Sequence, residues 1–247
     1  EAFLSRGHGT LIEAPDGENW YMMYHAFMNG RYNHARMPIL EPVEWTEGGW
    51  YRPVKDLDIK VVPEHKVSLS DDFDGDGLGW QWAGWKEDIT RSVFVKKGRA
   101  IVPARGAVPH EGRLMLITAT DSEYSVETEV TIKDKGLKAG LMLFYNEHAY
   151  AGLLCDGKTF TVYRTPESVE EIPNDIGRTV FIRLDFRKGL LDIRVSADGD
   201  DWSLLCKDID VSEYHHNRFG AFLALRPALC SLGSGQAEFD RFVYTSD

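Results

Sequence analysis

The sequence has few cysteines, no long apolar run and no excess of basic residues. It contains three cysteines in 247 residues, and their wide spacing predicts buried side chains rather than a disulfide or metal framework: Cys155, Cys206 and Cys230. No run of about 18 apolar residues is present, which excludes a membrane-spanning helix. Acidic residues outnumber basic ones by 39 to 28, for a formal net charge of −11. This balance disfavours a nucleic-acid or anionic-membrane partner.

What the sequence contains is typical of a globular all-β protein. Hydrophobic residues make up 43% and charged residues 27% of the chain. Hydrophobic alternation with a period of two extends almost throughout, and no helix-length stretch carries the 3.6-residue pattern. We therefore expect a soluble all-β protein, with its compartment open between the cytoplasm, the periplasm and secretion.

The first 51 residues predict a short four-stranded meander. Strands are expected at residues 9–13, 20–26, 32–37 and 43–51, with a hairpin signal at Asn29-Gly30 and an interruption at the prolines of 38–42. Four strands with one hydrophobic side do not close on themselves. The segment is therefore predicted to be one blade of a β-propeller.

The remainder of the chain predicts a linker and a second, larger domain. Residues 52–68 carry prolines and mixed charges without a clear period, as interdomain segments do. Residues 69–247 show about ten to twelve strands with regular turn signals, which favours a two-sheet β-sandwich or jelly roll. The clearest strands are expected at 124–132, 139–145, 149–155, 159–163, 180–186, 190–195, 219–225 and 237–244.

The first candidate functional residue is His8, which lies between two glycines. Its neighbours leave it exposed at the backbone level, although a turn histidine without function has the same pattern. The full pattern is Gly7-His8-Gly9, Asp16-Gly17, Trp20-Tyr21 and Tyr24-His25. It resembles the last blade of the family 43 glycoside hydrolases, five-bladed β-propellers that remove xylose or arabinose units from plant polysaccharides. The resemblance implies that His8 lies at the propeller axis, near a central metal ion or its water shell.

The second candidate is Arg36, within the segment 32–45 that leads into Glu44-Trp45. Family members have an arginine here, and the resemblance implies that Arg36 contacts sugar hydroxyls in the innermost subsite. Its fixed charge would also support ionised carboxylates nearby. Many relatives have glycine just before this arginine, whereas this chain has Ala35. The alternative is a solvated strand residue.

No catalytic carboxylate is assigned in this chain. Inverting glycoside hydrolysis needs a general acid and a general base about 6.5–9.5 Å apart. In the family, both lie on blades upstream of the matched segment. The resemblance therefore implies that missing N-terminal blades, or a partner chain carrying them, supply the acid and base. It also implies that this chain alone does not hydrolyse its oligosaccharide substrate. No organic cofactor is expected.

The second domain resembles the concanavalin-like module that follows the propeller in β-xylosidase-type members of the family. The matching segments are 70–73, 139–145, 219–222 and 236–244. The resemblance implies that Phe219 lies on a loop over the active-site rim, although a core phenylalanine is equally compatible. It also implies a structural calcium where the first and last strands meet, with Asp72 and Asp240 as ligands, although both also suit plain surface charges.

A second hypothesis is a non-catalytic module that binds carbohydrate on an aromatic face. Alternation along residues 80–85 would place Trp80 and Trp82 together, as a sugar platform or as core, with Trp85 nearby. The doublet His215-His216 is expected to serve a turn or a hydrogen bond, because adjacent strand residues point to opposite faces. Which pentose is released stays open.

Overall fold

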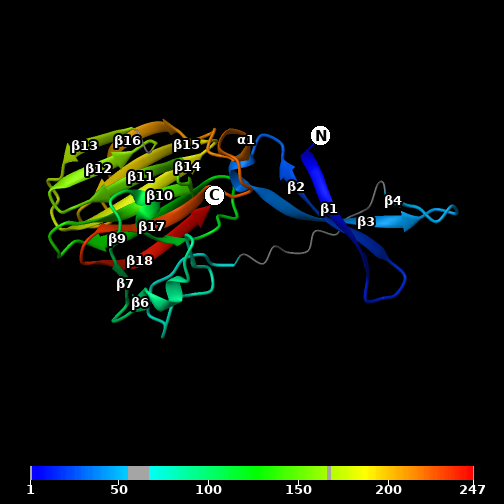
Figure 1. Cartoon of the computed structure of the whole chain (residues 1–247), viewed down its shortest axis with the longest axis horizontal. Helices are drawn as coiled ribbons and strands as arrows, with labels where there is room; N and C mark the ends of the chain where they lie inside the picture. Colours follow the sequence, from blue (N-terminus) through cyan, green and yellow to red (C-terminus); the bar gives the residue numbers. More distant parts are fainter. Residues whose placement is uncertain (1, 55–66, 166–167, 247) are drawn as a thin grey trace. The chain divides into compact units, whose positions relative to one another are not determined.

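The structure is a computed structural model that describes residues 2–54, 67–165 and 168–246. It divides into two compact units, Glu1–Val67 and Ser68–Asp247, and is built almost entirely of strands (Figure 1). The all-β prediction is confirmed. Most of the linker expected at 52–68 lies outside the described residues. No described helix is long and apolar enough to cross a membrane.

The first unit holds one four-stranded antiparallel sheet in the order β1-β2-β3-β4. Its strands are β1 (Phe3–Glu13), β2 (Trp20–Met28), β3 (Arg36–Trp45) and β4 (Tyr51–Pro53), with a 3₁₀ turn η1 (Tyr32–His34) before β3. The predicted meander is therefore present, in the strand order of a blade.

The third strand differs from the expectation. It runs through Pro38 and Pro42 instead of being interrupted there. The Val54 N–H donates to the Pro42 carbonyl at 3.0 Å, so the backbone N and C=O of Pro42 face away from β2. Pro38 lies four residues earlier and shares that edge, beyond the end of β4, whose last pair is Val43 with Pro53. Neither proline position has to donate a backbone hydrogen bond to β2, so the strand tolerates both prolines.

The second unit is a sandwich of two seven-stranded antiparallel sheets. The first sheet, in spatial order, contains β13 (Val169–Pro173), β12 (Thr159–Tyr163), β11 (Ala149–Cys155), β10 (Leu137–Asn146), β17 (Arg226–Gly233), β8 (Arg113–Leu116) and β5 (Ala83–Gly84). The second contains β16 (Ser203–Asp210), β15 (Leu190–Ser196), β14 (Thr179–Arg187), β9 (Tyr124–Thr131), β18 (Gln236–Ser246), β7 (Arg99–Pro103) and β6 (Phe94–Val95). Short helices are η2 (Ile89–Arg91), η3 (Pro109–Glu111) and α1 (His216–Phe219).

The main core lies between the two sheets and follows the alternation read from the sequence. In β14, the inward side chains Val180, Ile182 and Leu184 are fully buried, and in β10, Leu141 and Leu143 meet them from the opposite sheet. The alternate β10 residues pack into a second apolar cluster on the other face of their sheet. Each fully buried side chain of this size contributes about 1.5–3 kcal/mol relative to exposure.

One expected strand is wrong. Residues 219–225 form the end of α1 and a loop, and the strand begins only at Arg226. Gly220 and Ala221 have φ of 66° and 58°, and two consecutive residues of positive φ interrupt an extended backbone. The strand β17, which the sequence pattern did not indicate, instead lies between β10 and β8.

Candidate functional site

A bulge in β1 positions His8. The pairing of β1 with β2 shifts on both sides of Gly7, and His8 itself has a φ of 51°. Such a bulge turns a side chain away from the regular alternation of the strand. A Cβ at Gly9 would lie 2.7 Å from the Met22 sulfur, so a larger residue there would require the Met22 side chain to move. The ring is thus presented by the bulge and by the positive φ of His8 itself.

His25 on β2 joins the two residues that the sequence singled out. Its Nε2 lies 3.2 Å from His8 Nδ1 and 3.2 Å from Arg36 Nη1, and the two imidazole rings are 5.2 Å apart. A guanidinium can only donate hydrogen bonds, so His25 Nε2 is the acceptor in its contact with Arg36.

The guanidinium of Arg36 is also held by an aromatic ring. Its Cζ lies 5.3 Å from the centroid of Phe27, which is only 2% exposed. The strand starts directly after Ala35, whose φ of 60° and ψ of −156° belong to a region that only glycine adopts easily. Three strands thus converge on one charged group: β3 supplies it, and β2 and β1 fix it through His25, Phe27 and His8.

This arrangement can bind a polar ligand, but the blade's carboxylates have other contacts. Glu41 accepts a hydrogen bond from Tyr24 at 3.2 Å, and Tyr24 points away from the His25 side because it is the adjacent strand residue. Burial, followed by the charge of Glu41, raises the pKa of Tyr24. Glu44 pairs with Arg52 at 2.7 Å. These contacts give the two carboxylates structural partners away from Arg36.

Phe219, expected either over the active-site rim or in the core, packs on the core side of its loop. Phe219 is partly buried against the core, with its ring 5.9 Å from that of Tyr214. Phe222, three residues later, is 65% exposed and lies 6.3 Å from the His216 ring. The left-handed residues between the two phenylalanines reverse the chain. The loop therefore presents Phe222 outward, and the Gly-Ala pair before it was the available sequence signal.

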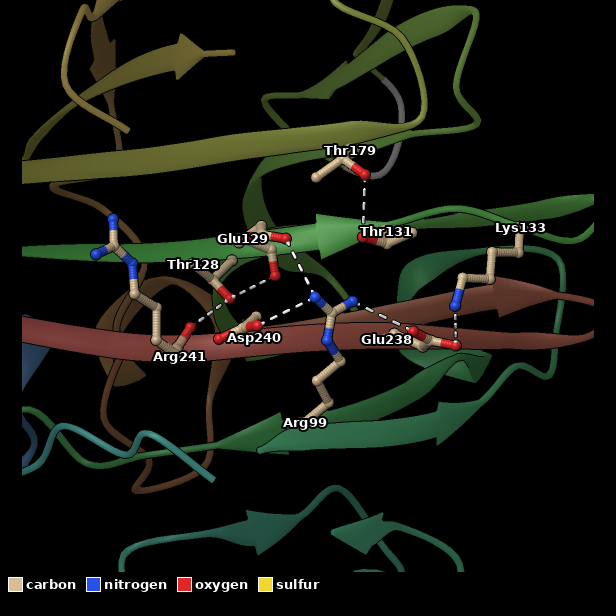
Figure 2. A network of polar contacts seen from close by, with 9 residues as sticks. All are labelled: Arg99, Thr128, Glu129, Thr131, Lys133, Thr179, Glu238, Asp240 and Arg241. Atoms are coloured by element: carbon tan, nitrogen blue, oxygen red, sulfur yellow. Dashed lines mark hydrogen bonds and ion pairs between the residues drawn. The ribbon is translucent and has the colours of Figure 1, made fainter. Parts of the chain in front are cut away.

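The two expected calcium ligands do not form a calcium cage. The Asp240 carboxylate contacts the Arg99 guanidinium at 3.2 Å (Figure 2), a cation where a second cation would have to bind. Asp72 accepts a turn hydrogen bond from the Asp74 N–H at 3.1 Å. Within residues 2–54, 67–165 and 168–246, no group of three or more His, Cys, Asp or Glu side chains is arranged for a metal ion. Calcium, and a metal near His8, remain untested expectations.

The expected tryptophan platform is wrong. Trp82 is buried in the sandwich core, where its indole N–H donates to Asp71 at 2.7 Å. Trp80 is 74% exposed, and Trp85 packs edge-on against Phe144, 5.0 Å away, on the second cluster. The segment turns at residues 79–82 instead of continuing as a strand, so alternation does not apply. The three rings therefore share no face.

His215 has the local role that was expected of it. Its Nδ1 accepts a hydrogen bond from the Asn217 N–H at 3.2 Å, which caps the short helix α1. A capping bond to the first turn satisfies a backbone donor that the helix itself cannot pair. The doublet with His216 thus serves the turn, as predicted.

Comparison with known proteins agrees with this division of the chain. Residues 1–51 match the model of glycosyl hydrolases family 43, and residues 70–245 match that of the beta xylosidase C-terminal concanavalin A-like domain. No curated protein sequence matches the chain.

Two solved structures share the fold over the whole chain. The protein described as Bacteroides ovatus Xyloglucan PUL GH43B is 17% identical with a TM-score of 0.83, and 100% of this chain covers 55% of it. A xylan beta-1,4-xylosidase from Bacillus halodurans C-125 is 19% identical with a TM-score of 0.82, and 100% of this chain covers 54% of it. The chain therefore spans about half the length of these proteins.

Proposed function

The chain belongs to glycosyl hydrolase family 43, and from that membership we propose that it is the C-terminal part of a glycoside hydrolase. The proposed enzyme removes xylose or arabinose units from oligosaccharides derived from plant polysaccharides, by inverting hydrolysis at the non-reducing end. The similarity to a xylan beta-1,4-xylosidase supports this substrate class. The family match over both units supports the reaction.

The observation that carries the proposal is the convergence of His8, His25 and Arg36 on one blade. Because His25 accepts from one Nη atom of Arg36, the other N–H groups of the fork retain a fixed direction. A planar donor held in this way suits two neighbouring oxygens of a sugar ring. Arg36 would therefore orient the sugar, with His25 as its positioning residue.

In this proposal, the general acid and base come from blades upstream of residue 1. Inversion requires two carboxylates separated by enough space for a water molecule. Glu41 and Glu44 have the structural contacts described above and are not assigned these roles. The partner that the blade requires is thus the remainder of a propeller, in the same chain or in another.

The sandwich contributes an aromatic side chain to the sugar site in the relatives that the sequence resembles. Phe219 packs against the sandwich core, whereas Phe222 is 65% exposed, so we assign this contact to Phe222. Phe222→Ala would then raise KM, whereas Phe219→Ala would mainly lower the stability of the sandwich.

The test is hydrolysis by the chain extended with its upstream blades. We expect release of pentose from 4-nitrophenyl β-xyloside or α-L-arabinofuranoside, and no release by residues 1–247 alone. Arg36→Ala should lower kcat/KM by about 100-fold or more, in the range found when a fixed transition-state donor is removed. The matched control is Arg52→Ala, an exposed arginine of the same sheet, which should retain activity.

Two outcomes would contradict the proposal. Full activity of the Arg36→Ala variant would remove the role given to that residue. Failure of every extended form to hydrolyse either glycoside would remove the reaction itself. Proton NMR of the first product formed would show the α-anomer of xylose from a β-xyloside if hydrolysis inverts the anomeric centre.

A further inference from the structure

A groove of about 690 Å³ lies on the outer face of the second sandwich sheet, at the edge formed by β6 and β7. Most of its lining residues are charged or polar, and two are apolar: Phe94, Lys96, Lys97, Arg99, Ile101, Lys133, Gln236 and Glu238. Four of these eight residues are cationic and one is anionic, in a chain whose net charge is −11. The groove is therefore a local exception to the acidity of the protein.

Strand pairing fixes the floor of the groove. Phe94 of β6 pairs with Ile101 of β7, which pairs in turn with Glu238 of β18, so the three side chains form a row on one face. The residues that alternate with them, such as Ala100 and Phe239, are fully buried in the sandwich core. The groove is thus built on a packed sheet and not on a loop.

Arg99 is held rigidly at the centre of this face. Figure 2 shows its guanidinium between Glu238 at 3.3 Å, Asp240 at 3.2 Å and Glu129 at 3.7 Å, with Lys133 donating to Glu238 at 2.6 Å. The hydrogen bond from Lys133 lowers the pKa of Glu238, whereas burial, followed by the charge of Asp240, raises that of Glu129. Because three carboxylates offset Arg99 and Lys133, these five residues make a structural network rather than a free anion site.

The Asp74 carboxylate lies beside Gly98, and the two cations of the groove outside this network are Lys96 and Lys97. Both are exposed, and within the described residues neither makes an ion pair. They lie in the tight β6–β7 turn, where the Lys96 N–H donates to the Arg99 carbonyl at 2.9 Å and Lys97 and Gly98 have φ of 55° and 68°. These dihedrals match a two-residue hairpin turn of the I′ type, which fixes the backbone from which the two lysines extend.

An exposed aromatic ring lies beside the two lysines. Phe94 is 57% exposed on the edge strand, next to Ile101 on the groove floor. An exposed ring offers an apolar surface to the C–H face of a sugar, while ammonium groups bind a carboxylate by charge-assisted hydrogen bonds. Gln236 and Glu238 add groups that can bond to hydroxyls. The combination fits an acidic sugar better than a plain anion or a neutral glycan.

We propose that this groove binds a short xylo-oligosaccharide carrying a uronic-acid carboxylate, with Lys96 and Lys97 on the carboxylate and Phe94 on the sugar ring. The choice of a xylan chain rests on the proposed function, whereas the carboxylate follows from the groove alone. A long polyanion is disfavoured, because repulsion from a chain of net charge −11 opposes the attraction of the two lysines. A single carboxylate interacts mainly with charges within a Debye length of about 10 Å, which here include the two lysines.

The test is calorimetric titration of the whole 247-residue chain with glucuronosyl-xylotriose and, separately, with neutral xylotriose. We expect the acidic sugar to bind about tenfold more tightly, since one good charge-assisted contact corresponds to about a factor of ten. Raising the salt concentration from about 0.05 M to about 0.5 M should reduce this advantage. Equal binding of the two sugars, or no binding of either, overturns the proposal.

Variants locate the binding within the molecule. The double variant Lys96→Gln with Lys97→Asn removes both charges and keeps a residue that tolerates the turn, so it should remove the tenfold preference. The matched control is Lys188→Asn, because Lys188 and Gly189 occupy the same kind of turn between β14 and β15, with φ of 52° and 80°. An equal loss of binding in this control would contradict a specific site.

A second pair of variants tests the aromatic contact. Phe94→Ala should lower the affinity for both sugars by about tenfold, in line with the loss of one exposed aromatic contact. Trp80→Ala removes a more exposed ring outside the groove and should leave binding unchanged. Loss of binding only in the Trp80 variant would place the site elsewhere and overturn the assignment of the groove.

The titration also separates this inference from the proposed function, because it needs no hydrolysis. Trigalacturonate provides the acidic comparison without a xylan chain. If it binds as tightly as glucuronosyl-xylotriose, the carboxylate site stands and its link to xylan is wrong. If the extended enzyme hydrolyses xylosides while the chain shows no preference for the acidic sugar, the groove proposal fails and the proposed function stands.

Discussion

The two units of the chain differ in how much apolar surface they can bury. The sandwich holds a continuous core between its two sheets and a second cluster on one outer face. The four-stranded unit buries only Tyr24, Ala26, Phe27 and Val43 among its described hydrophobic residues. It exposes large apolar side chains instead: Met23, Leu40, Trp45, Trp50 and Tyr51. The sandwich thus has its own core, whereas a single four-stranded sheet has no second sheet to cover its apolar side chains.

This difference explains why the functional residues divide as they do. The blade concentrates polar contacts on His8, His25 and Arg36, a cluster that extends across three strands of a sheet with few buried hydrophobic residues. The sandwich, which is stable by its own packing, presents its polar groups on outer faces such as the groove around Arg99. Stability and the candidate site therefore lie mainly in different units.

The largest difference between the two units is expected when each is expressed alone. Residues 68–247 expressed alone should fold cooperatively, because their core is complete between the two sheets. Residues 1–67 alone should remain unfolded, since a sheet with one unpaired apolar face is marginal in water. Amide NMR dispersion of the two pieces measures this directly. A well-dispersed spectrum for residues 1–67 would show that the blade is self-sufficient.

The next largest effect is expected in the sandwich core. Trp82→Ala should cost about 4 kcal/mol of unfolding free energy, because it opens a cavity beside Phe73 and leaves the Asp71 carboxylate without its indole donor. Trp80→Ala, two residues earlier, should change the unfolding free energy by less than about 0.5 kcal/mol. Urea unfolding of residues 68–247 gives both values. Similar costs for the two variants would contradict their separate environments.

A buried charge on the sandwich gives a somewhat smaller effect. Asp185 is 4% exposed and accepts hydrogen bonds from Ser125, from Arg183 at 2.8 Å and from Arg194 at 3.0 Å. Asp185→Asn should cost about 3 kcal/mol, because it leaves two partly buried arginines without their shared anion. The control is Asp200→Asn on an exposed turn, for which almost no change in urea unfolding is expected.

The same residue gives a pH dependence with a definite sign. Burial by itself raises the pKa of Asp185, but the hydrogen bonds from Ser125 and Arg183 outweigh it and hold the pKa below its usual value. Its stabilisation is therefore complete above the unfolded pKa of about 3.9 and is lost as the pH falls through the lower folded pKa. The stability gap between wild type and Asp185→Asn should narrow below about pH 4. A constant gap would contradict the assignment.

The smallest effect concerns the blade and tests its strained backbone. Ala35→Gly should stabilise the extended enzyme by about 1 kcal/mol, because Ala35 has a φ and ψ that only glycine adopts without cost. Ala14→Gly, at a position without positive φ, should be neutral or destabilising. Thermal unfolding of both variants checks the difference. Destabilisation by Ala35→Gly would show that the alanine methyl makes a contact worth more than the strain.

Much of the fold could be predicted because the information is local. The strands β11 and β12 begin and end where the alternation placed them, and the β14–β15 hairpin forms around its Lys-Gly turn. The failures lie where a few residues override the pattern. Gly220 and Ala221 turn left-handed within an apolar run, and the segment around Trp80 turns before an alternating strand can form.

The candidate site divides in the same way. The sequence motif identified His8 and Arg36, but the role of His25 depends on the register of three strands, which places Gly7 and Pro38 opposite it. The family resemblance implied Asp240 as a calcium ligand, and no local pattern shows which side chain lies beside it. The structure pairs it with Arg99, more than a hundred residues away along the chain.

By itself, the sequence determined the all-β class and indicated the two-part organisation, since alternation and short motifs are properties of neighbouring residues. The tertiary structure decided which ring of the 219–222 segment faces outward and that the three tryptophans lie in different environments. It also decided that β18 brings Glu238 beside Ile101 and Phe94 of the β6–β7 hairpin in one groove. These outcomes depend on which strands lie side by side. That choice is made by packing and by hydrogen bonds between distant segments, which no local pattern records.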